Sequence, residues 1–485
     1  TRLFHYEGMH DEASSDVISR MYPDEIVFEQ LCHKESIIGL MNGVMNLLAA
    51  DNKDVTCDMY ETMPVVLCEY AHAMGNSLGN FSDYIQGFEN FPHMCGGFIW
   101  DFVDQAICVK EGDTKKYLYG IDFEEIYSPY GFKKPKDKTG DGAFCGNGIV
   151  AADRTWHPSA YEVKQGYQWL EVIEKDLLSG EFYIFNKQMF SKIYPAYRLE
   201  WELSVDGKII QKKEVCPQLL AEIMPGEKRL FCIKEIKEKE YPDSGEITIQ
   251  FYFIHNEGND WYEAGEIQAK SQFVIRQEKT LVLSEKKPRN TENQSYERLF
   301  VNGREFVFSG MKISLELSRV ATDNNIDLGH FVPQLESIVA VRRWDVANKK
   351  MSVLEQHTKN ENGVISIHTK YKHPFCSVLE SNLTDYGDGR LECVLSIMTK
   401  SMDLVSCGFS MESKNLYENC SWYGRGPHEC YCDRKDSAFI GAYTRNIEDM
   451  SHMYLRPQEN GNRCDVKNVT ITGNQKKIDI CDLSG

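Results

Sequence analysis

One segment, VVLCEYAHAMGN at residues 65–76, limits most strongly what this chain can fold into. Its first four residues are apolar, as in a buried strand, and the run stops abruptly at the carboxylate of Glu69. Residues 77–92 then carry apolar side chains at a helical period, and a further strand-like run follows. A strand, a helix and a strand in succession predict a parallel βαβ unit. Glu69 then falls at the carboxyl end of a strand, where parallel-sheet enzymes place catalytic groups.

The same alternation extends over residues 1–165, for which we expect a parallel sheet. The strand-like runs are RLFHYE (2–7), DVISRMYP (16–23), PVVLCEY (64–70) and GGFIWDFVD (96–104). Four strands of this kind cannot by themselves close an eight-stranded barrel.

Two β-rich regions follow, and a chain of 485 residues is long enough for about two to four domains. Residues 166–277 predict one immunoglobulin-like β-sandwich. The polar segment 278–297 is the expected boundary, and residues 278–485 are expected to form a large β-sandwich domain. The expected strands are EFYIFNKQ (181–188), AYRLEWELSVDGKII (196–210), GEITIQFYFIH (245–255), SQFVIRQ (271–277), ERLFVNGREFVFS (297–309), KISLELSRV (312–320), GVISIHTKY (363–371), GRLECVLSIMT (389–399) and DICDLSG (479–485).

Charge and cysteine content restrict the partners and the compartment. A net charge of −19 argues against nucleic acid and anionic membranes, and it suits a neutral or cationic ligand. No run of about 18 apolar residues is present, so no transmembrane helix and no membrane partner are expected. Many of the 16 cysteines lie in apolar runs, which predicts buried free thiols and a cytoplasmic location. Both ends look cut, so we expect the true N-terminus, with any targeting signal, outside this sequence; secretion stays open.

Polar and aromatic side chains follow two of the expected strands. His72 comes three residues after Glu69, and the next strand ends with Trp100, Asp101 and Asp104. The same edge of the sheet therefore collects carboxylates, a histidine and a tryptophan. Carboxylates beside an aromatic platform are what a sugar site needs, because one acid attacks or stabilises an oxocarbenium-like centre and the ring packs on the sugar. The plainer interpretation of Glu69 is a strand-end carboxylate in a salt bridge.

Two metal chemistries compete with this interpretation. Glu7 with His10, and Glu69 with His72, form two Glu-x-x-His units like those of di-iron helix bundles. Such units need helices, whereas each glutamate here ends a strand-like run, so we do not expect a di-iron site.

Zinc is the second alternative, because cysteines and a histidine cluster in CSWYGRGPHECYCD. These residues are Cys420, His428, Cys430 and Cys432. A structural zinc site usually has C-x₂₋₄-C spacing, which this cluster lacks, so buried free cysteines are expected instead. The sequence also lacks a P-loop, a dinucleotide fingerprint and a G-x-S-x-G elbow.

Five motifs together resemble one family, the long-chain bacterial β-galactosidases of glycoside hydrolase family 2. The motifs are LCEYAHAMGNSLGNFSDY, GGFIWDFVDQ, FCGNGIVAADRTWHP, WYGRGPHE and QENGNRCD. The match runs in order from Tyr6 to Cys464, and AHAMGNS is specific to this subgroup rather than to β-glucuronidases. The resemblance implies a multidomain retaining exo-glycosidase with a central (β/α)₈ TIM barrel. Residues 1–165 would be the second half of that barrel, with the nucleophile on the third of four strands, and residues 278–485 a truncated galactose-mutarotase-like domain.

The resemblance also implies a role for each matching residue of the sugar site. Glu69 would be the nucleophile and would form a covalent galactosyl-enzyme. His72 would hydrogen-bond galactose hydroxyls, and Trp100 would be the platform for the sugar ring. Tyr22 would lie beside the nucleophile and help the sugar to leave it.

Two metal ions, Na⁺ and Mg²⁺, follow from the same resemblance. Phe144 would supply a sodium ligand from its backbone carbonyl, and Asn147 another from its side chain. The magnesium ligands and the general acid/base of the family lie upstream of Thr1, as do the first barrel strands. Glu7 would then be a supporting residue rather than the acid. One departure lies in the last domain, where HECYCDR (428–434) replaces a Glu-Asn-Tyr-x-Asp-Arg pattern.

The expected function is hydrolysis of terminal β-D-galactosyl residues, as in lactose, with retention of configuration. We expect little or no activity from the isolated chain, because its acid/base is missing. Three alternatives stay open: a subunit completed by a separate N-terminal chain, a non-catalytic carbohydrate-binding remnant, and a β-glucuronidase, which would need a cationic clamp. The complete enzyme is expected to be a homo-oligomer.

Overall fold

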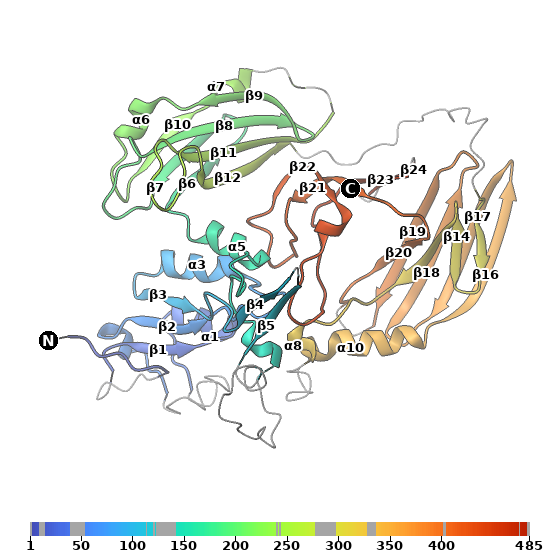
Figure 1. The fold of residues 1–485 in the computed structure, drawn as a ribbon, viewed down its shortest axis with the longest axis horizontal. Coiled ribbons are helices and arrows are strands. Elements are labelled where there is room, and N and C mark those ends of the chain that lie inside the picture. Colours follow the sequence, from blue (N-terminus) through green and yellow to red (C-terminus); the bar gives the residue numbers. More distant parts are fainter. Residues whose placement is uncertain are drawn as a thin grey trace.

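Three units follow one another along the chain in the computed structural model (Figure 1). It describes residues 2–8, 15–38, 54–112, 114–119, 122, 142–238, 241, 244–276, 297–326, 336–400, 404–474 and 476–482. Within these residues, no helix is both long and apolar enough to cross a membrane.

A three-stranded parallel sheet forms the centre of the first unit. Its strands are β1 (Ile18–Met21), β2 (Val65–Tyr70) and β3 (Met94–Ile99), in the order β1-β2-β3. The register pairs Met21 with Glu69, and Tyr70 with Ile99, so the three carboxyl ends lie at one edge. Three of the four strands expected in residues 1–165 are thereby confirmed.

The first expected strand, RLFHYE, is wrong. Residues 2–6 are irregular, although a backbone hydrogen bond of 2.8 Å joins Asp16 N to Phe4 O. The apolar side chains of this segment have no cover within the described residues, and Phe4 is 73% exposed. A strand needs a series of backbone hydrogen bonds to a neighbouring strand, and the one backbone bond between Asp16 and Phe4 does not form such a ladder. Glu69 therefore lies on the middle strand of three, not on the third of four.

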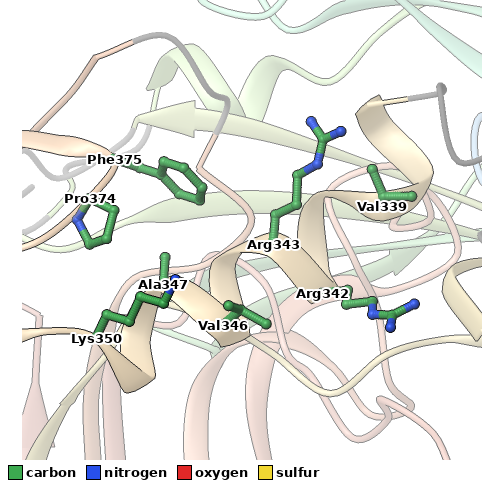
Figure 2. A pocket seen from close by; sticks show the side chains of 8 residues that line it. All are labelled: Val339, Arg342, Arg343, Val346, Ala347, Lys350, Pro374 and Phe375. Atoms are coloured by element: carbon green, nitrogen blue, oxygen red, sulfur yellow. The ribbon is translucent and has the colours of Figure 1, made fainter.

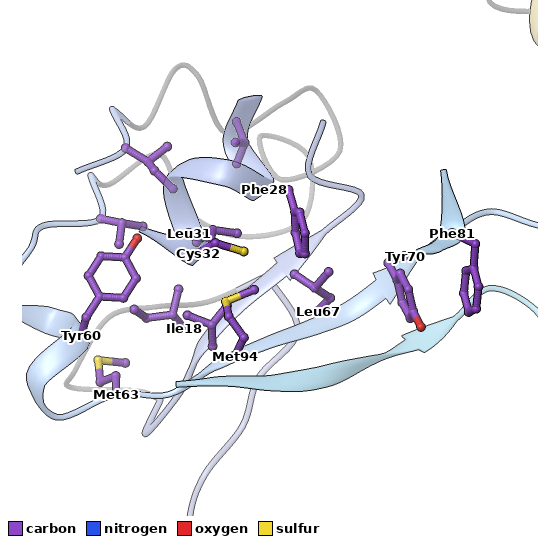
Figure 3. Packing of buried hydrophobic residues seen from close by; sticks show 14 of the residues in the cluster. Ile18, Phe28, Leu31, Cys32, Tyr60, Met63, Leu67, Tyr70, Phe81 and Met94 are labelled. Atoms are coloured by element: carbon purple, nitrogen blue, oxygen red, sulfur yellow. The ribbon is translucent and has the colours of Figure 1, made fainter. Parts of the chain in front are cut away.

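Two helices pack on the sheet, and their buried side chains join those of the strands in one core, part of which Figure 3 shows. α1 (Glu25–Cys32) begins at the cap Asp24, whose side chain accepts the Val27 N–H, and α3 (Phe81–Asn90) is the helix expected after residue 76. Ile18, Leu67 and Met94, one from each strand, are buried with side chains of both helices. Each such side chain contributes about 1.5–3 kcal/mol through burial. This core holds β2, and with it Glu69, in place.

The helices approach closely because α3 carries a glycine where it meets α1. A Cβ on Gly87 would lie 2.4 Å from the Phe28 ring. The remaining elements of the first unit are β4 (Ile107–Glu111), β5 (Thr114–Leu118) and α5 (Pro158–Gly166).

The second unit is the expected two-sheet β-sandwich. One sheet has the order β10-β7-β6 and the other β12-β11-β8-β9, and all their pairings are antiparallel. Phe182, Trp201 and Phe251 are buried between the sheets. The elements are β6 (Leu170–Asp176), β7 (Glu181–Asn186), β8 (Tyr197–Val205), β9 (Lys208–Glu214), α6 (Pro217–Ala221), β10 (Lys228–Cys232), α7 (Lys234–Glu238), β11 (Ile247–His255) and β12 (Ile267–Arg276).

The third unit is β-rich, as expected, and its described residues form three four-stranded antiparallel sheets and a long helix, α10 (Figure 1). Trp344 of α10 is buried. Most of the expected boundary, 278–297, lies outside the described residues. The elements are β13 (Phe300–Asn302), β14 (Glu305–Phe308), β15 (Met311–Glu316), α8 (Asp323–Ile326), α10 (Glu336–Lys349), β16 (Ser352–Glu361), β17 (Val364–Lys372), β18 (Cys376–Asp385), β19 (Leu391–Thr399), β20 (Gly408–Ser413), β21 (Asn419–Gly426), β22 (Phe439–Asn446), β23 (Asn468–Gly473) and β24 (Lys476–Cys481).

Candidate active site

The carboxyl ends of β1, β2 and β3 bring the expected sugar-site residues together. Tyr22 follows β1 directly, and its backbone N–H donates to the carbonyl of Glu69 at 2.8 Å. Trp100 follows β3, and its N–H donates to the carbonyl of Tyr70 at 3.1 Å. His72 lies just beyond β2, and its ring centroid is 5.8 Å from that of Tyr22, edge to face. One parallel sheet thus places these four residues at the same edge, from segments up to about 80 residues apart in sequence.

Glu69 is a half-buried carboxylate among other oxygens. Burial raises its pKa, and the neighbouring carboxyls of Glu7 and Asp101 raise it further, while a hydrogen bond from the Tyr22 hydroxyl opposes these effects. Burial and the same contact with Glu69 raise the pKa of Tyr22, so the phenol keeps its proton and donates. The result is a partly desolvated carboxylate with one oxygen oriented by a phenol, which is the arrangement that a carboxylate nucleophile needs.

His72 is a neutral imidazole in this setting. Burial lowers its pKa, and the negative charge of Asp101 only partly opposes that effect. Its ring lies between those of Tyr22 and Phe144, with a centroid distance of 5.3 Å to Phe144. A neutral imidazole both donates and accepts a hydrogen bond, as recognition of sugar hydroxyls requires.

Trp100 and Asp101 form a tightly held corner after β3. The carbonyl of Trp100 accepts the Ala73 N–H at 2.7 Å, and the peptide bond between Trp100 and Asp101 is cis. The Asp101 carboxylate accepts the Phe102 N–H at 2.6 Å and the Gln105 side-chain amide at 3.1 Å. Asp101 was not among the expected binding residues, although its place directly after Trp100 was the signal that could have found it.

The position of Asp104 at the strand end suggests a role in the sugar site, but its contacts are structural. Its carboxylate is buried, and it accepts the Gly148 N–H at 2.8 Å and contacts His157 Nε2 at 3.1 Å. It therefore holds the loop around residue 148 rather than facing the sugar-site residues.

Glu7 lies against the proposed nucleophile. Its carboxyl hydrogen-bonds the Glu69 carboxyl, although the side chain is exposed. The Glu-x-x-His pairing of Glu7 with His10 cannot be placed, because His10 lies outside the described residues.

The two expected sodium ligands lie next to this group. Phe144 contacts the His72 ring, and Asn147 is buried at 1% exposure on the segment that pairs with the corner after β3. The Asn147 carbonyl accepts the Asp101 N–H at 2.7 Å. The side-chain Oδ1 of Asn147 is buried and has no hydrogen-bond partner within the described residues. A buried amide oxygen without a donor is the kind of ligand that hard cations take, so the residues present fit a sodium ion.

The cysteine and histidine cluster of the third unit is spread over separate contacts. The ring of His428 stacks on Tyr161 at 4.3 Å, and its Nε2 contacts Ser437 Oγ at 2.9 Å. Cys432 is exposed. In the described part of the chain, no three histidine, cysteine or acidic side chains converge as metal ligands would.

The third unit holds the segment that follows Glu69. Arg434 is buried, and its guanidinium donates to Ser77 O at 2.7 Å and to Asn76 Oδ1 at 2.8 Å. The Asn76 side chain donates in turn to Glu459 O at 2.7 Å, and its backbone N–H to Gln458 Oε1 at 3.1 Å. These contacts fix the Gly-Asn turn of the AHAMGN motif from residues more than 350 positions away, which no local pattern predicts.

A groove of about 460 Å³ lies elsewhere, along α10 (Figure 2). Its lining combines apolar side chains with Arg342, Arg343 and Lys350. None of its lining residues belongs to the first unit, so the groove is separate from the carboxylates described above.

Comparison with family models assigns each unit in turn. Residues 1–172 match the model described as glycosyl hydrolases family 2, TIM barrel domain. Residues 182–276 match β-galactosidase, domain 4, and residues 289–484 match β-galactosidase small chain.

Three curated relatives are named β-galactosidase. The protein of Priestia megaterium (strain DSM 319 / IMG 1521) is 30% identical over 98% of this chain and 44% of its own length. That of Vibrio cholerae serotype O1 (strain ATCC 39541 / Classical Ogawa 395 / O395) is 31% identical over 85% of this chain and 41% of its own length. That of Psychromonas ingrahamii (strain DSM 17664 / CCUG 51855 / 37) is 26% identical over 97% and 46%. The chain therefore spans less than half the length of the relatives that it matches.

Proposed function

This chain belongs to the β-galactosidases of glycoside hydrolase family 2, and from that premise we propose that it supplies the nucleophile side of a retaining β-galactosidase site. The observation that carries the proposal is the group formed by Glu69, Tyr22 and His72 at one edge of a parallel sheet. Trp100 at the next strand end adds the aromatic platform.

The proposed reaction is a double displacement. The Glu69 carboxylate attacks the anomeric carbon, and the glycosidic oxygen leaves with a proton from an acid outside these 485 residues. Water then releases galactose with retention. Tyr22 donates to Glu69, so its hydroxyl is placed to stabilise the carboxylate as the sugar departs. His72 and Trp100 position the sugar through its hydroxyls and its apolar face.

A neutral sugar suits this site better than a glucuronide does. The charged side chains that most affect the pKa values of Glu69 and His72 are the carboxylates of Glu7 and Asp101. A glucuronate carboxylate would meet like charges here, whereas galactose or lactose would not.

Sodium is the cofactor that the residues support. Phe144 would offer its carbonyl and Asn147 its buried Oδ1, beside His72. The ion would hold a sugar hydroxyl electrostatically when bound. For magnesium, which the family resemblance implies, the described residues do not assemble a ligand set.

We further propose that a separate or preceding N-terminal segment completes the site. Leu3, Phe4, Phe98 and Phe102 are large apolar side chains exposed on the first unit. Large apolar side chains exposed to water favour a further protein surface that covers them. All 16 cysteines are free thiols, which supports a cytoplasmic enzyme.

The test compares leaving groups on the chain alone. 2,4-Dinitrophenyl β-galactoside hardly needs a proton to leave, whereas phenyl β-galactoside does. We expect hydrolysis of the first that requires Glu69, and hydrolysis of the second slower by about 10²–10⁴-fold for want of an acid. Restoration of phenyl galactoside cleavage by an added N-terminal half would support completion of the site. Equal rates on the dinitrophenyl glucuronide, or full activity of Glu69→Gln, would contradict the proposal.

A further inference from the structure

Two cysteines of the third unit, Cys430 and Cys464, lie 34 positions apart in the sequence and contact each other in the structure. The backbone N–H of Cys464 donates to the Cys430 sulfur at 3.2 Å, and the two thiols hydrogen-bond each other. Their segments are also joined by the backbone, since Cys430 N donates to Asn462 O at 3.0 Å. The Asn462 side chain donates back to Cys430 O at 2.7 Å. Cys430 occupies a position of the HECYCDR segment where the resembled family has asparagine.

The surroundings favour a thiolate at one member of the pair only. Hydrogen bonds from Cys464, together with the cations of Arg463 and Arg425, lower the pKa of Cys430 to about 7, although burial opposes them. The contact with Cys430, together with burial, raises the pKa of Cys464, which keeps its proton. A thiolate beside a protonated partner is the arrangement of a reactive cysteine with its resolving cysteine.

Access to the pair is from the side of Cys464. Cys430 is fully buried, whereas Cys464 is half-buried and lies on a segment whose neighbour Asp465 is exposed. Hydrogen peroxide, which is close to water in size, is therefore the oxidant that we consider.

We propose that Cys430 and Cys464 form a redox-reactive dithiol that closes to a disulfide on reaction with a hydroperoxide. The Cys430 thiolate attacks one peroxide oxygen, the O–O bond breaks, and hydroxide leaves, which gives a sulfenic acid. The Cys464 sulfur then attacks that sulfur and releases water. In sum, two thiols and one hydrogen peroxide give one disulfide and two waters; the sulfurs are oxidised and the peroxide is reduced.

The disulfide would tie together the two segments that brace the turn after the nucleophile. Glu429, next to Cys430, accepts hydrogen bonds from Arg434 at 2.8 Å and from Gly461 N at 2.7 Å. Arg434 and Gln458 reach Asn76 from these same segments. Oxidation would therefore lock the brace, and we expect a higher unfolding temperature for the oxidised chain than for the reduced chain.

The test treats the full chain with hydrogen peroxide, alkylates the remaining thiols, and maps peptides by mass spectrometry without reduction. We expect one Cys430–Cys464 linked peptide per chain, lighter by two hydrogens and absent after reduction. Cys464→Ser should leave Cys430 as a sulfenic acid, which dimedone captures when the oxidised chain is unfolded in its presence. Cys432→Ser, which removes an exposed thiol two positions from Cys430, is the matched control and should keep the link.

Either of two results would overturn the proposal. One is oxidation of the unmodified chain in which the 430–464 link is absent while both thiols stay alkylatable. The other is reaction of Cys430 no faster than that of Cys376, a buried cysteine in contact with His373 at 3.3 Å but without a thiol partner.

Discussion

At the scale of single residues, Glu69 ionises in surroundings that oppose its charge. Burial and two neighbouring carboxyls raise its pKa in the folded chain. Between the unfolded and the folded pKa values, Glu69 is therefore protonated in the folded chain but already ionised in the unfolded chain. The stabilising effect of this proton is complete below the unfolded pKa of glutamate, about 4.3, and is lost as the pH rises through the raised folded value.

We therefore expect Glu69→Gln to raise the unfolding temperature at neutral pH, because it removes the repulsion and keeps an oxygen for Tyr22. The gain should shrink as the pH falls below the folded pKa of Glu69. Thermal unfolding of both chains across a pH series measures this, with the exposed Glu257→Gln as the control. A lower unfolding temperature for Glu69→Gln at pH 7 would show that the carboxylate is structural.

Glu7 affects the pKa of the Glu69 carboxylate. Its contact with Glu69 raises the pKa of Glu69, so Glu7→Gln should lower that pKa. We expect the acid limb of dinitrophenyl galactoside hydrolysis to move to lower pH in the variant. A loss of phenyl galactoside cleavage alone, with no movement of the limb, would instead identify Glu7 as the acid.

At the scale of elements, the loop around residue 148 depends on a glycine. A Cβ on Gly148 would lie 2.2 Å from Asp104 N and 2.4 Å from the carbonyl carbon of Val103. Gly148→Ala must push this backbone apart, at a cost of about 1–3 kcal/mol in stability. Denaturant unfolding measures the cost. Gly408→Ala, whose Cβ meets nothing within 4 Å, should cost less, and equal losses would contradict the account.

The sequence predicts those strands and helices whose own residues show a regular apolar spacing. The runs that became β1, β2 and β3, and the helical period of α3, were read correctly because their buried residues recur at strand or helix spacing. The sequence does not predict β6 and β10, since four of the seven residues of LEVIEKD and two of the five of KRLFC are charged. RLFHYE looked like a strand, but strand formation needs a partner that its own residues cannot specify.

The candidate site was predictable in part for the same reason. Residues at the ends of parallel strands meet at one edge, so Glu69, His72 and Trp100 could be grouped from the sequence. The Arg434 brace on Asn76 could not, because 358 positions separate the two side chains and only tertiary packing brings them together.

At the scale of the whole molecule, the third unit contacts the first through Arg434, which a buried ion pair within the third unit holds in place. Arg434 and Glu429 are each 3% exposed and lie 2.8 Å apart, and Arg434 also reaches Asn76. Arg434→Met leaves Glu429 buried without its partner and should cost about 3–5 kcal/mol. Arg390→Met, which breaks an ion pair of a 45% exposed arginine with Asp388, should cost about 0–1 kcal/mol in the same denaturant titration. Similar losses of unfolding free energy in the two variants would show that the buried Arg434–Glu429 pair does not stabilise the molecule as we expect.

The central claim is that the fold presents Glu69 to the anomeric carbon of a galactoside. The most direct measurement is peptide mapping of the chain after incubation with 2,4-dinitrophenyl 2-deoxy-2-fluoro-β-galactoside, which needs no acid to react. The account predicts one fluorogalactosyl group per chain, on Glu69, and none in Glu69→Gln. Attachment to Glu7 or Asp101, or labelling that persists in Glu69→Gln, would contradict it.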